Sequence, residues 1–144
     1  MFRRSNVMKE ERGVELRAHG YTCSQAVGCN YCEELGMDEK TMFRFLEGFG
    51  GGFGCTLGTC GALSAAIACA GLKKSTANLD RPDSKGQTYQ LTRVITKRFQ
   101  EEAGAILCCD LKGIHTGKVL CDCNDCVRIG CRLVEEVVLA DTPK

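Results

Sequence analysis

Cysteine is the residue type in this chain with the greatest capacity for chemistry, because twelve cysteines occur among 144 residues. Only two histidines, His19 and His115, accompany them. A metal site built from this inventory would consist mainly of thiolates, which favour iron–sulfur clusters, zinc or Cu(I). In a reducing compartment this cysteine density indicates metal ligation or redox chemistry rather than a disulfide framework.

The spacing of the cysteines does not by itself identify a site. They fall into four groups: Cys23, Cys29 and Cys32; Cys55, Cys60 and Cys69; Cys108 and Cys109; and Cys121, Cys123, Cys126 and Cys131. Two C-x2-C pairs, at 29/32 and 123/126, imitate zinc spacing but lie in helical patterns. The bacterial ferredoxin run is absent, and neither pair is followed by the histidine of a c-type haem site.

A glycine-rich segment, "GFGGGFGCTLGTCGA" at 48–62, could bind phosphate, present a nucleophile or surround a metal cluster. A P-loop is excluded because no lysine stands where the motif needs one. A nucleophilic Cys60 would need His19 or His115 as its base, and we interpret both as solvated histidines. Glycine lets the main chain curl around cluster sulfurs, and a helix starting near Cys60 would direct N–H groups at them. Close packing between helices is the other explanation of these glycines.

The elements that must position these thiols are predicted to be helices. Apolar residues recur at helical spacing, and no convincing strand alternation is present. The sequence predicts a single all-α domain over 1–144, a bundle of five or six helices with a glycine-rich loop. The expected helices cover residues 6–18, 23–35, a segment that Asp38 caps, 60–74, 87–103 and about 122–140.

The apolar residues of two predicted helices are expected to face the core. They are Met42, Phe43, Phe45 and Leu46 in the helix after Asp38, and Leu91, Val94, Ile95 and Phe99 in the helix at 87–103. Cys32, Cys69 and Cys131 lie inside helical patterns, and we expect packed thiols or surface residues there.

Composition excludes several classes of function. The formal net charge is +1, from 19 basic and 18 acidic residues, which gives no charged footprint for nucleic acid or a membrane surface. No apolar run is long enough to span a bilayer. The segment "MFRRSNVMKEERG" lacks the apolar stretch of a signal peptide. We therefore expect a soluble, cytoplasmic protein without a membrane span.

Five sequence blocks occur in an order that resembles a known family. They are "GYTCSQAV" at 20–27, "GFGGGFG" at 48–54, "TCGALSAA" at 59–66, "CCDLKG" at 108–113 and "CNDCVRIGCRLVEEVV" at 123–138. Together they resemble the redox-active family named for its C, GCAxxG, C, C pattern, over about residues 10–140. That domain is also similar to the iron–sulfur part of split-Soret cytochromes. Ala65 stands where the family usually has a second glycine.

The resemblance implies an iron–sulfur cluster, [2Fe-2S] or [4Fe-4S], with four cysteine ligands. Carried over by position, these ligands are Cys23, Cys60, Cys108 and Cys123. The additional cysteines leave open whether Cys55, Cys109 or Cys126 replaces one of them.

The resemblance also implies an electron carrier or redox partner rather than an enzyme with a substrate pocket. Its expected partner is a redox protein, and a homodimer stays open. Two alternatives remain: a metal-free thiol–disulfide redox protein with Cys60 as the attacking thiolate, and a zinc-stabilised structural or adaptor domain.

Overall fold

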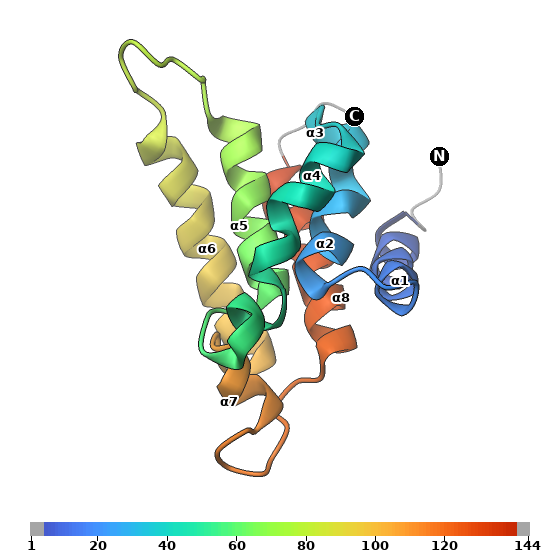
Figure 1. Ribbon diagram of the computed structural model, residues 1–144. Helices are drawn as coiled ribbons and strands as arrows, with labels where there is room; N and C mark the ends of the chain where they lie inside the picture. The colour runs from blue at the N-terminus through green and yellow to red at the C-terminus, as the bar shows by residue number, and fades with distance from the viewer. Residues whose placement is uncertain (1–4, 141–144) are drawn as a thin grey trace.

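A computed structural model describes residues 5–140 and confirms the predicted all-α class (Figure 1). The main helices are α1 (Ser5–Ala18), α2 (Cys23–Gly28), α4 (Glu39–Leu46), α5 (Gly61–Lys74), α6 (Lys85–Ala103) and α8 (Cys123–Leu133). Two shorter helices are α3 (Cys32–Leu35) and α7 (Cys108–Lys112). Short 3₁₀ segments cover Cys29–Tyr31 and Glu47–Phe49, and π-helical turns cover Gly52–Thr56 and Val134–Val138.

Side chains that satisfy free backbone N–H groups define where the helices begin. Thr22 forms a capping box with Gln25 at the start of α2. Asp38 caps α4, as the sequence predicts, and Asp122 caps α8 through the N–H of Asp125. Cys23 and Cys123 directly follow two of these capping residues.

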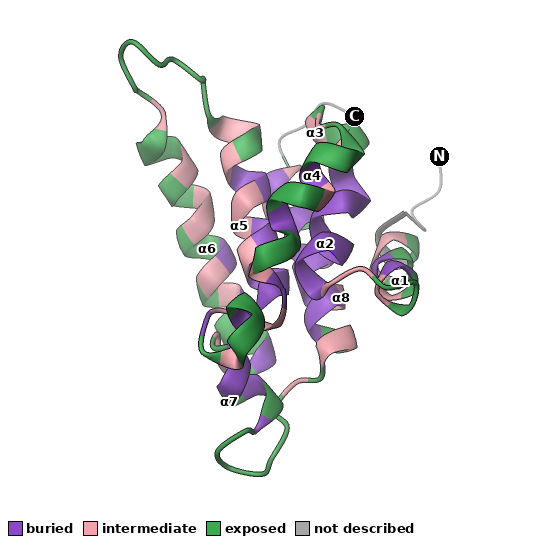
Figure 2. Ribbon diagram, viewed as in Figure 1, coloured by how far each residue is buried: buried purple, intermediate pink, exposed green. Residues whose placement is uncertain are grey.

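Helix α5 lies at the centre of the bundle, in contact with α2, α6 and α8. Burial is concentrated on α2, α5 and α8, the purple ribbons of Figure 2. The inward face of α5 consists mainly of alanine, and a Cβ added at Gly130 of α8 would lie 3.0 Å from the carbonyl oxygen of Ala62. Small residues therefore let the two helix backbones approach closely.

The predicted helix at 23–35 is interrupted. A 3₁₀ segment at Cys29–Tyr31 separates α2 from α3, and Tyr31 itself has φ −126° and ψ 21°. Tyr31 is fully buried, and its hydroxyl donates to the carbonyl oxygen of Cys131 at 3.0 Å. Tertiary anchoring of Tyr31 accounts for a break that the local helical pattern does not contain.

Two residues expected in the core are exposed. Phe45 of α4 is 57% exposed and Val94 of α6 is 45% exposed, whereas Met42, Leu46, Ile95 and Phe99 are buried as predicted. Phe43 and Leu91 are half-buried and pack against the core. Each helix buries a narrower stripe than its apolar residues suggest.

Over residues 5–140, every helix is too short or too polar to cross a bilayer.

Cys131 makes stability sensitive to alkaline pH. Burial raises the pKa of its thiol from near 9 to about 11. The unfolded chain therefore ionises this thiol first, and the stabilisation present below pH 9 is lost as the pH rises toward 11. The loss should be on the order of 1 kcal/mol at about pH 10. Urea unfolding of the reduced protein measures this loss. The difference in free energy of unfolding between the wild type and Cys131→Ala should decrease by that amount from about pH 8 to about pH 10. A constant difference between the two proteins would contradict this assignment.

Candidate thiol centre

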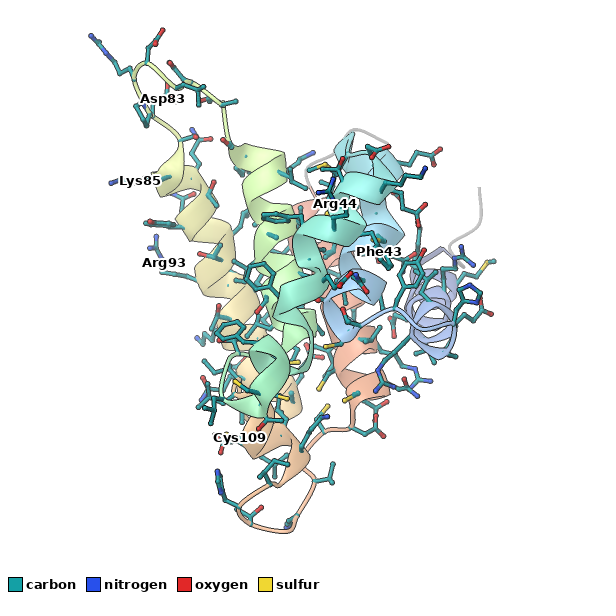
Figure 3. All side chains as sticks on the ribbon, viewed as in Figure 1. Phe43, Arg44, Asp83, Lys85, Arg93 and Cys109 are labelled. Atoms are coloured by element: carbon teal, nitrogen blue, oxygen red, sulfur yellow. The ribbon has the colours of Figure 1, made fainter. Side chains whose placement is uncertain are left out.

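Six thiols from separate parts of the chain surround one small cavity of about 20 Å³, room for roughly one water molecule. These thiols belong to Cys23, Cys60, Cys108, Cys121, Cys123 and Cys126. Gly51, Gly61, Leu111 and Lys112 complete the lining. In Figure 3, sulfur atoms gather at the end of the bundle where α7 approaches the start of α8. The four cysteines singled out from the sequence thus lie around the same cavity, together with two more.

Each of the four predicted cysteines stands at the beginning of a helix. Cys23 is the first residue of α2, Cys108 of α7 and Cys123 of α8, and Cys60 is the N-cap of α5. Cys108 is thus the start of a short helix of five residues. Free N–H groups at the starts of longer helices such as α5 and α8 favour a thiolate over a thiol.

Backbone pairing holds Cys60 beside Cys108. The N–H of Cys60 donates to the carbonyl oxygen of Ile106 at 2.8 Å, and the N–H of Cys108 donates to that of Gly58 at 2.9 Å. The two cysteines flank an isolated antiparallel bridge between the glycine-rich segment and the approach to α7. This pairing fixes the separation of two thiols that are far apart in sequence.

Glycine is required in this loop for two reasons: neighbouring groups lie too close for a side chain, and the backbone has positive φ values. A Cβ added at Gly61 would lie 2.5 Å from the sulfur of Cys23, and one added at Gly52 would lie 2.4 Å from the Cβ of Cys108. Gly51 and Gly52 also have φ values of +63° and +62°, which side chains disfavour. The segment therefore wraps the main chain tightly around the thiols.

Cys60 is the thiol most easily ionised in this group. The Cys126 thiol donates a hydrogen bond to it, which lowers the pKa of Cys60 to about 7 against the opposing effect of burial. The N–H groups of Leu63 and Ala62, in the first turn of α5, and the Lys112 ammonium act in the same direction. A negative charge on this sulfur is thus stabilised by the fold.

Cys126 lies in the middle of a row of three thiols. Its S–H group contacts Cys60 on one side, while on the other side it reaches the Cys121 thiol and the Cys121 carbonyl oxygen, at 3.7 Å. Donation to Cys60 raises the pKa of Cys126 strongly. Burial raises the pKa of Cys121 and likewise of Cys23 and Cys108. The fold therefore favours a negative charge on Cys60 and a proton on Cys126 beside it.

The other cysteines lie outside the cavity. Cys55 is exposed, and its thiol faces the carbonyl oxygen of Gly52 at 3.6 Å. Cys109, labelled in Figure 3, is adjacent to Cys108, and its sulfur lies 3.9 Å from the Asp110 carboxylate. Of the three replacements left open by the sequence, Cys126 alone lines the cavity.

Sequence reasoning named Cys121 only among the additional cysteines. It lies in the irregular segment between α7 and α8, where no local pattern signals an inward position. Cys69 and Cys131 are fully buried elsewhere in the core, as expected of packed thiols. His19 and His115 are exposed and contribute nothing to the lining.

An open pocket of about 410 Å³ adjoins the centre and shares part of its lining. Cys23, Cys123, Gly51 and Lys112 border both spaces, and Arg17 lies on the outer side. Cys23 and Cys123 thus lie between the centre and this open pocket, on a side that carries two cations.

A bound metal would require these thiols to be arranged differently around the cavity. Among the described residues, no three His, Cys, Asp or Glu side chains are arranged to hold a metal ion. The composition of the centre nevertheless fits an iron–sulfur cluster, since its donors are soft thiols and N–H groups from Gly51, Ala62 and Leu63 face the sulfurs of Cys23 and Cys60. Deprotonation would also remove the S–H contacts that now join the sulfurs.

Neither a curated protein nor a solved structure is similar enough to this chain to match it. The pattern that defines one protein family, however, matches residues 21–137, which include all six cysteines of the centre. The chain therefore belongs to the family described as "Putative redox-active protein (C_GCAxxG_C_C)".

Proposed function

We propose that this protein is an electron-transfer protein whose thiol centre holds an iron–sulfur cluster. Cys23, Cys60, Cys108 and Cys123 are the proposed ligands. A bound cluster would supply one-electron redox chemistry. The observation that carries the proposal is the gathering of six thiols, without a histidine or carboxylate, from four segments of the chain around one cavity.

The backbone supports this ligand set. Each of the four cysteines stands at a helix start, so its side chain can turn inward without disturbing a helix interior. Cys126 lies one turn into α8 and competes with Cys123 for the same corner of the cavity. We assign Cys126 and Cys121 to the surroundings of the centre, where a thiol can donate to a ligand sulfur.

The position of the centre suits exchange of electrons with another protein. The adjoining pocket brings solvent close to Cys23 and Cys123, and Arg17 and Lys112 give this side positive charge. An acidic redox partner would therefore be steered toward it at low ionic strength. A cofactor deep in the bundle would lack this access.

Thiol–disulfide exchange is the second candidate function, favoured by the contact between Cys60 and Cys126. A thiolate on Cys60 next to a protonated thiol is the arrangement of an attacking and a resolving cysteine. In this case an external disulfide would oxidise the pair to a Cys60–Cys126 disulfide and leave as two thiols.

Metal and sulfide analysis of anaerobically purified protein distinguishes the candidates. We expect a brown protein with equal amounts of iron and acid-labile sulfide. Its electron paramagnetic resonance spectrum after reduction would then identify the cluster type. Colourless protein with stoichiometric zinc would instead support a structural zinc domain. Colourless, metal-free protein that forms a Cys60–Cys126 disulfide with glutathione disulfide would support thiol exchange.

A further inference from the structure

A second pair of thiols lies outside the cavity, where α2 passes into α3. Cys29 begins the 3₁₀ segment at Cys29–Tyr31, and Cys32 directly follows it. In a 3₁₀ turn the residues i and i+3 are stacked, with Cα atoms about 6 Å apart. That separation is within the range of about 4.4–6.8 Å found in disulfides. The two thiols are close enough that each affects the pKa of the other.

The two residues between these cysteines are anchored to other helices. The Asn30 side chain donates to the carbonyl oxygen of Lys9 in α1 at 2.7 Å, and the Lys9 ammonium donates back to the Asn30 carbonyl oxygen at 2.7 Å. The Tyr31 hydroxyl binds the Cys131 carbonyl oxygen in α8. The turn is therefore fixed by contacts that involve neither thiol, and these contacts can persist when the thiols change oxidation state.

We propose that Cys29 and Cys32 form a reversible disulfide, a second redox site independent of the thiol centre. Cys32 is the outer, attacking thiol, because it is partly exposed. Cys29 is buried and is the resolving thiol. The oxidant is a small-molecule disulfide such as glutathione disulfide.

The reaction balances in two exchanges. The Cys32 thiolate attacks one sulfur of the oxidant, which forms a mixed disulfide and releases the first thiolate. The Cys29 thiolate then attacks the sulfur of Cys32, which closes the protein disulfide and releases the second thiolate. Two electrons pass from the protein to the oxidant, and the two protons of the dithiol end on the released thiols.

The surroundings of the pair favour its disulfide over its thiolates. Burial raises the pKa of Cys29 to about 12 and also raises that of Cys32, and the Glu39 carboxylate acts in the same direction on both. Asp38 and Glu34 add negative charge near Cys32. Because the fold does not stabilise a thiolate here, the balance between the dithiol and its disulfide is shifted toward the disulfide.

The Cys123–Cys126 pair offers an internal comparison at the same sequence spacing. Both residues lie in the regular helix α8, where residues i and i+3 are also neighbours, so the spacing alone does not distinguish the two pairs. Cys126 directs its thiol at Cys60 and Cys121 instead. Oxidation should therefore distinguish the two C-x2-C pairs.

The experiment exposes the purified full-length protein to excess glutathione disulfide, blocks free thiols with N-ethylmaleimide and maps the cysteines by tandem mass spectrometry. In the wild type we expect a Cys29–Cys32 disulfide, with loss of fragment ions between the two residues, and no Cys123–Cys126 disulfide. Cys29→Ser should accumulate a glutathione adduct on Cys32, because the resolving thiol is gone. Cys32→Ser should leave Cys29 unmodified in the folded protein.

Two further variants serve as controls for this interpretation. Cys55→Ser removes an exposed thiol elsewhere and should form the 29–32 disulfide like the wild type. Cys29→Ala keeps the buried position apolar and should give the same Cys32 adduct as Cys29→Ser, with helicity checked by circular dichroism. Persistent glutathione on Cys32 in the wild type, or preferential pairing of Cys29 or Cys32 with another cysteine, would overturn the proposal.

Discussion

Anaerobically purified Cys60→Ser protein is expected to lose the visible absorbance of the cluster and most of its iron. An alcohol oxygen is a poorer ligand than a thiolate for a soft iron–sulfur site. The substitution should leave the fold intact because Cys60 is the N-cap of α5, a position that serine favours. Iron content, acid-labile sulfide and the absorption spectrum measure the loss, and circular dichroism checks the helices.

The remaining cysteines provide graded controls for this result. Cys23→Ser, Cys108→Ser and Cys123→Ser should behave like Cys60→Ser. Serine variants of three thiols outside the cavity, Cys32, Cys69 and Cys131, should retain the cluster. A Cys60→Ser protein with a full complement of iron and sulfide would show that the central ligand is wrong. Loss of the cluster in Cys126→Ser but not in Cys123→Ser would identify Cys126, one turn further along α8, as the fourth ligand.

Gly61→Ala is expected to destabilise the metal-free, reduced protein by about 1–3 kcal/mol, since it overpacks a closed site. The added Cβ would lie 2.5 Å from the Cys23 sulfur and 2.9 Å from the carbonyl oxygen of Phe49, and the backbone contact cannot yield by a rotamer change. Displacement of Cys23 should also reduce the amount of cluster bound. Urea unfolding measures the first effect and iron analysis the second.

Gly71→Ala is the matched control, because Gly71 lies in the same helix and a Cβ there meets nothing within 4 Å. This variant should gain about 0.5–1 kcal/mol of stability, since alanine loses less backbone entropy than glycine in a helix. It should bind the same amount of iron as the wild type. Equal free energies of unfolding for the two variants would show that the close contacts at Gly61 do not affect stability.

Local sequence signals predict most of the helices, but they do not predict which faces of those helices are exposed. Asp38 and Asp122 mark helix starts by capping, and the periodicity at 87–103 identifies most of α6. Periodicity does not say how wide the buried stripe is, so Phe45 was placed in the core although its ring is largely exposed. The interruption at Tyr31 depends on a hydrogen bond to α8, about 100 residues away, which no window of sequence contains.

The candidate centre was only partly predictable for the same reason. Cys23, Cys60, Cys108 and Cys123 follow from the order of the family's sequence blocks, and the structure places them around one cavity. Whether they ligate a cluster stays a prediction. Cys121 carried no signal because an irregular segment has no period from which an inward face could be inferred. The contact between Cys60 and Cys126 likewise joins residues whose separation in sequence conceals their proximity.

The assembly of one cavity from residues as distant as Cys23 and Cys126 also imposes a delay during synthesis. At about 5–20 residues per second, a ribosome needs roughly 5–20 s to add the intervening segment. Over that interval Cys23 and then Cys60 exist as nascent-chain thiols without their later neighbours. Delivery of iron and sulfide before α8 emerges would meet an incomplete set of thiols. Loading of the proposed cluster would therefore belong after translation of α8, and its insertion would act as a checkpoint on completed folding.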